Sequence, residues 1–237
     1  MDLLGGRKFL DASGLNLFAV LAVDELPVSS RRALNSLNLD LQRYSSLVLI
    51  GSAGSSFWDQ IQAQGLDGDH PFDDRSRELA WKFVKNYVGD VGAELVYPSS
   101  IPLPLIELGN HAGWSFPSQL GLGIHEIFGT WFSFRAVLLL AMKIPATKPV
   151  DNSESPCLSC ISKPCVRQCP ASAVKRQGAF NVRLCTSYRQ QKKSHCQDRC
   201  LARIACPLGQ NFQYSLSQMQ YHARRSLASI INYSQKS

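Results

Sequence analysis

The first 156 residues of this 237-residue chain contain no cysteine. The chain also lacks a run of about 18 uncharged apolar residues, which is the length that a membrane-spanning helix needs. Its longest apolar stretch, residues 15–26, is interrupted by Asn16, Asp24 and Glu25. Asp2 precedes any basic residue and no small-residue cleavage site follows, so the N-terminus does not resemble a signal peptide. We therefore expect a cytoplasmic protein with no membrane partner.

Charged residues are scarce as well, at 18% of the chain, while glycines and prolines number 16 and 12. This composition excludes a long coiled coil and a collagen-like rod. Hydrophobic residues make up 45% of the sequence, which is enough for a packed core and excludes bulk disorder. The length suits one large domain or two small ones.

Residues 1–150 show the pattern of a mixed domain of the α/β or α+β class. Apolar runs over 15–23, 46–50 and 136–142 predict strands. Asp73 or Asp74 is expected to cap a helix that reaches about Val88. The Gly- and Ser-rich segment 51–56 predicts either a plain loop after a strand or a backbone cradle for a phosphate.

All eight cysteines lie in one 50-residue window. The first group is Cys157, Cys160, Cys165 and Cys169, and the second is Cys185, Cys196, Cys200 and Cys206. Each group ends in a Cys-Pro pair, at Pro170 and Pro207. A secreted disulfide scaffold would spread its cysteines and would need an export signal. We therefore expect free thiols that ligate metal.

Closely spaced cysteines that end in Cys-Pro are typical of two-cluster ferredoxins, where the fourth cysteine of one run binds the other cluster. By that logic one [4Fe-4S] cluster takes Cys157, Cys160, Cys165 and Cys206, and the other takes Cys169, Cys185, Cys196 and Cys200. The spacings within the groups differ from the usual ones, so the assignment to each cluster stays open at this point. Structural zinc is the alternative, because zinc sites also use Cys-x2-Cys pairs.

Basic residues are concentrated in the same part of the chain as the cysteines. Residues 1–150 hold 12 Lys and Arg against 15 Asp and Glu, whereas residues 151–237 hold 13 against 3, a net charge of +10. Thiolate-bound clusters are anionic, so this charge can compensate them, and a polyanionic partner is the other interpretation. Residues 145–156 resemble a linker, and 213–233 predict an amphipathic helix with Arg224 and Arg225 on its wet side.

Several stretches of the sequence resemble the epoxyqueuosine reductase family. They are Pro104 to Glu107, Ala112 to Trp114, Ile124 to Phe132, and Cys185 to Tyr188 between the two cysteine groups. The similarity covers roughly residues 100–207. The segment from Ile124 to Leu140 is also similar to cobalamin-processing, decyanating proteins.

The resemblance implies a reduced nitroreductase-like, cobalamin-binding domain followed by a ferredoxin-like double-cubane module. On this chain they would occupy residues 1–150 and 151–210, with a C-terminal helix over 211–237. The implied activity is a reductase that passes electrons from two [4Fe-4S] clusters to the cobalt of a bound corrinoid. An external low-potential electron donor would supply the electrons.

The resemblance also implies a set of cobalamin contacts around residue 130. They are Gly123, His125, Phe128, Gly129, Trp131, Phe132 and Arg135. Each has an ordinary structural alternative, since a lone histidine in an apolar stretch is commonly a core residue and aromatic side chains commonly pack. No catalytic residue is assigned.

Two departures from the family bear on the substrate. The reductases carry an acidic proton donor at the position of Ile101, and their C-terminal tRNA-gripping domain has no counterpart in a chain that ends about 30 residues after Cys206. A queuosine-precursor tRNA is therefore a weakened candidate, and the substrate stays unassigned. The alternatives are a corrinoid-processing or trafficking protein and a simple electron-transfer protein.

Overall fold

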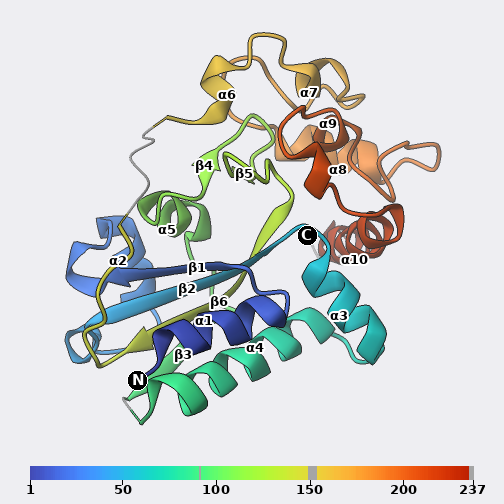
Figure 1. The fold of residues 1–237 in the computed structure, drawn as a ribbon. Helices are drawn as coiled ribbons and strands as arrows, with labels where there is room; N and C mark the ends of the chain where they lie inside the picture. Colours follow the sequence, from blue (N-terminus) through green and yellow to red (C-terminus); the bar gives the residue numbers. More distant parts are fainter. Residues whose placement is uncertain (91, 149–153, 235–237) are drawn as a thin grey trace. The chain divides into compact units, whose positions relative to one another are not determined.

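The computed structural model of the chain describes residues 1–90, 92–148 and 154–234. Two compact units are present, residues 1–116 with 132–153 and residues 117–131 with 154–237 (Figure 1). This division differs from the boundary expected at residue 150, because the segment 117–131 packs with the cysteine-containing part. The predicted linker over 145–156 lies partly outside the described residues.

A four-stranded sheet in the order β1-β2-β6-β3 forms the centre of the first unit (Figure 1). The strands are β1 Leu17–Ala22, β2 Ser46–Ala53, β3 Ala93–Tyr97 and β6 Phe132–Leu140. Every pair within this sheet is antiparallel. Of the two classes expected from the sequence, the fold is therefore α+β and not α/β.

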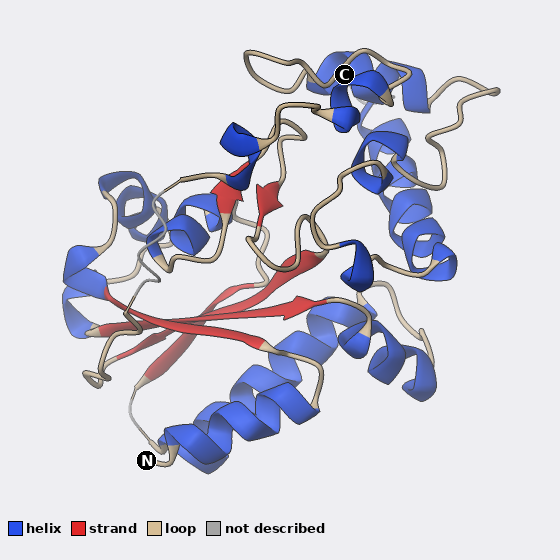
Figure 2. Ribbon diagram, turned by 45° about the horizontal axis from the view of Figure 1, so that its top comes forward, coloured by secondary structure: helices blue, strands red, loops and turns tan. Residues whose placement is uncertain are grey.

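The core of the first unit sits on the two central strands. The side chains of Leu47–Ile50 on β2 and Ala136–Leu140 on β6 have no exposed surface. Helices α1 (Leu3–Ala12) and α4 (Pro71–Phe83) lie side by side along one face of the sheet (Figure 2), and α3 (Ser56–Gln64) contacts β2. Burial on both faces explains why β2 reads as a continuous apolar run in the sequence.

The remaining helices of the first unit are short. They are α2 (Val28–Asn35), α5 (Leu105–His111) and the 3-10 turns Val23–Glu25 and Leu41–Arg43. Glu107 on α5 accepts hydrogen bonds from the hydroxyls of Ser29 and Ser30 on α2, both at 2.5 Å. These bonds connect the two helices and lower the pKa of the Glu107 carboxyl.

The predicted strands exist, but their ends differ from the expectation. Strand β2 continues to Ala53 because Gly51, Ser52 and Ala53 pair with β6 beyond a bulge at Ile50/Gly51. The expected loop or phosphate cradle over 51–56 is therefore wrong for its first half, where the backbone belongs to the sheet. A side chain at Gly51 would meet the Ser133 carbonyl at 2.9 Å, which explains the glycine there.

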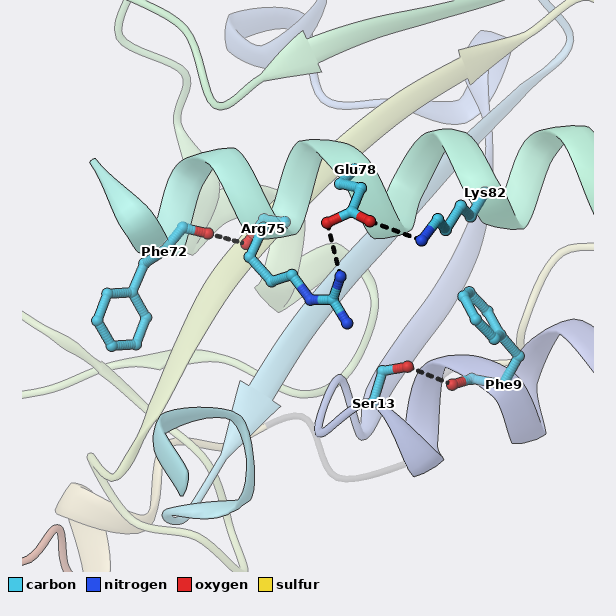
Figure 3. A network of polar contacts seen from close by, with 7 residues as sticks. Phe9, Ser13, Phe72, Arg75, Glu78 and Lys82 are labelled. Atoms are coloured by element: carbon cyan, nitrogen blue, oxygen red, sulfur yellow. Dashed lines mark hydrogen bonds and ion pairs between the residues drawn. The ribbon is translucent and has the colours of Figure 1, made fainter. Parts of the chain in front are cut away.

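Helix α4 begins three or four residues earlier than expected, depending on which aspartate is taken as the cap. Pro71 occupies its first turn, so Asp73 and Asp74 lie inside the helix near its N-terminus instead of capping it. Carboxylates there interact favourably with the helix dipole. Further along, Glu78 lies 2.6 Å from both Arg75 and Lys82 (Figure 3). A π-helical turn, Val84–Val88, follows α4, so the predicted end near Val88 is confirmed.

The second unit consists of short helices joined by loops. They are α6 (Pro156–Ser159), α7 (Pro164–Arg167), α8 (Val182–Arg189), α9 (Leu201–Ile204) and a 3-10 turn at Gln210–Phe212. The long helix α10 (Leu216–Ser234) confirms the predicted C-terminal helix, and Arg224 and Arg225 are exposed on it. The strands β4 (Phe116–Pro117) and β5 (Gly123–Ile124) form a minimal ladder.

No strand occurs within the described residues 154–234. The likeness of this part to a ferredoxin therefore rests on the order of its cysteines. Its apolar core is small, with Leu120, Val174 and Ala202 at the centre. Cys165 and Cys169 pack against that core, so the cysteine-bearing loops form part of the interior of the unit.

Candidate functional site

Four of the eight cysteines surround one cavity of the second unit, called here the first cysteine cavity. Its volume is about 530 Å³, and its walls include Cys157, Cys160, Cys165 and Cys206. Pro156 and Pro164 start the helices α6 and α7, which places Cys157 and Cys165 in the first turn of each. Proline suits this position because it lacks the amide hydrogen that a first turn leaves unbonded.

The other four cysteines surround a second cavity of the same unit, called here the second cysteine cavity. Its volume is about 330 Å³, and its walls include Cys169, Cys185, Cys196 and Cys200. Cys185 lies on α8, and Cys200 immediately precedes α9. The side chains of Val174, Ala202 and Phe180 line the same cavity and make part of its wall apolar.

The electrostatic coupling of the thiols follows the same division. Burial raises the pKa of Cys165, and the neighbouring Cys206, Cys157 and Cys160 raise it further. Burial likewise raises the pKa of Cys185, with further increases from Cys200, Cys169 and Cys196. Cys165 and Cys185 are therefore each influenced by the other three thiols of their own cavity, which is the arrangement expected of two separate four-thiol sites.

Cys200 lines the second cysteine cavity and has exposed surface, whereas Cys196 beside the same cavity is buried. Protein atoms close to the Cys200 thiol desolvate it, which is the main reason that its pKa is raised.

All eight cysteines are free thiols, and four of them line each of the two cavities. No three His, Cys, Asp or Glu side chains in the described part of the chain are placed to share one metal ion. A tetrahedral zinc ion would need sulfur ligands within about 4 Å of one another, since each Zn–S bond is about 2.3 Å. A four-iron cluster binds each of its thiolates through a different iron.

The residues expected to contact cobalamin are divided between the two units. Gly123, His125, Phe128, Gly129 and Trp131 belong to the second unit, and Phe132 and Arg135 belong to the first. Among the three cavities described within the second unit, only the second cysteine cavity is lined by one of them, Trp131. The structure therefore does not bring the seven together around one of these cavities.

Within the second unit, His125 and its neighbours have close packing partners. The His125 Nδ1 atom accepts the Ile127 amide hydrogen at 3.0 Å, and its ring lies 4.7 Å from that of Phe128. Burial lowers the pKa of His125. A side chain at Gly129 would meet the Leu208 carbonyl at 2.1 Å, so a neighbouring loop already accounts for that glycine.

Trp131 is fully buried in the second unit. Its ring lies 5.3 Å from that of Tyr214, and the Arg203 guanidinium stacks 4.4 Å from its centre. Phe132 and Arg135 pack within the first unit instead. The Phe132 ring is 6.1 Å from that of Trp114, and the Arg135 Nε atom donates to the Ser52 hydroxyl at 3.0 Å. Gly123 begins the short strand β5.

Three arginines lie on the walls of the second cysteine cavity, Arg189, Arg199 and Arg203. The sequence singled out Arg199 and Arg203 among the basic residues that could offset the charge of bound clusters, but it did not single out Arg189. The net charge of residues 151–237 signalled that cations gather near the cysteines, but not which of them face a cavity. Which cations face a cavity depends on the fold. The Arg189 guanidinium, for example, reaches from α8 to carbonyls and a hydroxyl on other parts of the second unit.

The helices of the described part of the chain include none with the length and apolar character needed to cross a membrane.

No protein-family model matches the chain. It is similar to the epoxyqueuosine reductase of Aliivibrio fischeri, with 27% identity over 142 residues, which is 52% of this chain and 36% of that protein. It is 25% identical to the epoxyqueuosine reductase of Vibrio cholerae over 160 residues, which is 61% of this chain and 40% of the relative. The chain thus matches less than half the length of these curated relatives, which are named as oxidoreductases.

Solved structures extend the likeness to the fold. The epoxyqueuosine reductase of Streptococcus thermophilus has a TM-score of 0.59 at 16% identity, over 90% of this chain and 67% of that one. An epoxyqueuosine reductase with an epoxyqueuosine-modified tRNA stem loop has a TM-score of 0.60 at 15% identity, covering 92% and 68%. The C. elegans B12-trafficking protein CblC has a TM-score of 0.50 at 15% identity, covering 95% and 94%.

The class defined by these findings is an α+β protein with the fold of the epoxyqueuosine reductases and of a B12-trafficking protein. The resemblance to epoxyqueuosine reductases drawn from the sequence is confirmed by the curated relatives and by the structural neighbours.

Proposed function

We propose that this chain is an oxidoreductase of the epoxyqueuosine reductase type, in which two [4Fe-4S] clusters pass electrons to the cobalt of a bound corrinoid. The observation that carries the proposal is the arrangement of eight free thiols, four around each of two cavities. Such clusters supply one-electron transfer over a wide range of potentials. The named relatives support the reaction class.

The chain's own residues would hold the clusters. Cys157, Cys160, Cys165 and Cys206 would bind the cluster of the first cysteine cavity, and Cys169, Cys185, Cys196 and Cys200 that of the second. Apolar wall residues such as Ile124 and Val174 would limit the access of water. So many free thiols persist in a reducing compartment, so the proposal includes the cytoplasm as the location.

The corrinoid part of the proposal rests on the family resemblance. The seven expected contacts around residue 130 remain predictions, because in the structure they have packing partners within their own units. The roles of residues 1–150 as cobalamin-binding domain and of 151–210 as cluster module, with an external low-potential electron donor, belong to the same proposal.

A second candidate function is the processing or trafficking of corrinoids. Residue 101 favours corrinoid processing. The reductases that this sequence resembles have an acidic proton donor at that position, whereas this chain has isoleucine. The Ile101 side chain is 37% exposed, so the position is open to a ligand but offers no proton. The structural match to the B12-trafficking protein covers 94% of that protein, which also favours corrinoid processing. A tRNA substrate, as in the stem-loop complex of a neighbour, is the competing proposal.

The decisive experiment is metal and corrinoid analysis of the full chain purified under nitrogen. We expect a brown protein with about eight irons and eight acid-labile sulfides per chain. Cys165→Ser and Cys196→Ser form a matched pair, one from each cavity, and each should lose about four irons. A colourless protein with stoichiometric zinc would overturn the proposal.

Corrinoid binding is tested separately on the iron-loaded protein. Added cobalamin should show a shifted corrin spectrum, and a low-potential one-electron donor should reduce it only when both clusters are present. Turnover of an epoxyqueuosine-containing stem loop would support the reductase. Removal of cyanide from cyanocobalamin without such turnover would support corrinoid processing, and an unchanged corrin spectrum would leave a simple electron carrier.

A further inference from the structure

The two cysteine cavities differ in the charge on their walls. Arg189, Arg199 and Arg203 line the second cysteine cavity, whereas Lys163 is the cation that lines the first. The Lys163 ammonium donates to the Arg176 carbonyl at 3.3 Å, and its side chain is only partly buried. Arg167 and Arg176 donate to the Ser162 and Ile161 carbonyls on the wall of the first cavity, but both of these arginines are exposed to solvent, which screens their charge. The partly buried guanidinium groups are therefore concentrated around the second of the two four-thiol sites.

Arg203 is held rigidly against the second cysteine cavity. Its Nε atom donates to the Thr130 hydroxyl at 3.3 Å, and its Nη2 atom donates to the Thr130 carbonyl. The guanidinium also stacks on the rings of Trp131 and Tyr214, at 4.4 and 4.9 Å from their centres. None of these partners carries a negative charge, so the positive charge of Arg203 is not neutralised by them.

Arg189 is fixed in a similar way from another direction. Its guanidinium donates to the Cys196 carbonyl at 3.2 Å, the Ala223 carbonyl at 2.8 Å and the Ser226 hydroxyl at 3.2 Å. These partners are again neutral. Arg199 differs, because Asp198 neutralises it through an ion pair at 2.9 Å. The second cysteine cavity thus has two fixed guanidinium groups without a carboxylate partner among these contacts.

We propose that Arg189 and Arg203 raise the reduction potential of the cluster in the second cysteine cavity, so that this cluster accepts the first electron. The inference rests on the proposed function, since it requires both clusters. Reduction adds one electron from an external one-electron donor and one negative charge to the cluster, with no bond made or broken. Positive charge nearby stabilises the more negative state.

The test is a dithionite titration of the anaerobic, iron-loaded full chain, followed by electron paramagnetic resonance. Cys160→Ser and Cys185→Ser alter one ligand in each cavity and identify which signal belongs to which cluster. In the wild-type protein the first electron should give the signal of the second cysteine cavity. Arg203→Gln and Arg189→Gln should each shift that midpoint potential to a more negative value.

Matched variants separate charge from packing. Arg203→Lys keeps the positive charge and should keep most of the wild-type potential, which a purely structural role of Arg203 would not predict. Lys163→Gln should leave the cluster of the second cysteine cavity unchanged. The inference is overturned if the other cluster is reduced first, or if neither arginine variant shifts the potential while eight irons are retained. Absence of iron would instead contradict the proposed function.

Discussion

Leu47–Ile50 and Ala136–Leu140 of the first unit are fully buried, whereas six of the eight cysteines in the second unit are half-buried and one is exposed. The first unit thus has an apolar core between a sheet and its helices, of the kind that stabilises domains through burial. The second unit has a small core around Leu120 and Val174, with two cavities beside the cysteines. We therefore expect the stability of the second unit to depend on the proposed clusters more than on apolar burial.

The largest expected effect is the loss of the second unit on removal of metal. When clusters bridge loops from distant parts of the sequence, their binding energy contributes to folding. Chelation of iron under reducing conditions should therefore remove most hydrogen-exchange protection from residues 154–234, while strands β2 and β6 remain protected. Mass spectrometry of peptides after exchange measures both units at once. Equal loss in the two units would contradict the comparison.

A substitution in the apolar core should destabilise the first unit and leave the second unit unchanged. Leu49 is fully buried on β2, so Leu49→Ala should lower the free energy of unfolding of the first unit by about 2–5 kcal/mol. The iron content should not change. Leu158 in the second unit is 68% exposed, and Leu158→Ala is the control that should alter stability by no more than about 0.5 kcal/mol. Denaturant unfolding and iron analysis check both variants.

A pair of glycines tests how closely the second unit is packed. Both Gly129 and Gly178 have positive φ, at 58° and 89°, but only at Gly129 would a side chain meet another backbone, the Leu208 carbonyl at 2.1 Å. Gly178→Ala should cost about 1–2 kcal/mol through backbone conformation alone. Gly129→Ala should cost about 1–3 kcal/mol more through the clash. Similar unfolding midpoints for the two variants would refute the close approach.

The smallest expected effect concerns pH. Burial lowers the pKa of His125, so the folded second unit favours the neutral imidazole. Its contribution to stability is fully present above the ordinary histidine pKa of about 6.5 and is lost as pH falls toward the lowered value. His125→Asn keeps an acceptor for the Ile127 amide and should weaken the pH dependence between about 7 and 5. Thermal melts of the iron-loaded proteins give the comparison.

Features set by neighbouring residues were predicted well from the sequence. The apolar run of β2 and the spacing of α10 produced a strand and a helix at the expected places, because periodic burial is visible within a short segment. Their ends were less accurate. The sequence predicted a loop at Gly51, but pairing with β6 extends the strand, and that partner lies some 80 residues away along the chain.

The cobalamin contacts expected around residue 130 remain predictions, but the packing partners of these residues could not be read from the sequence. The glycines and aromatic residues around 130 suggested walls for a macrocycle, since both residue types suit a flat ligand. In the structure Gly129 lies against Leu208, and Trp131 lies against Arg203 and Tyr214. These partners follow the run by more than 70 residues, so local pattern gave no sign of them.

The sequence by itself determined the kinds of residues available: eight thiols in one window, an excess of basic side chains around them, and apolar segments sufficient for a sheet. Only the tertiary structure decided that Arg189 and Arg203 face one cavity while Arg199 is neutralised by Asp198. Composition and spacing depend on the order of residues along the chain. The charge felt at a cavity instead depends on distances in space between side chains from separate elements.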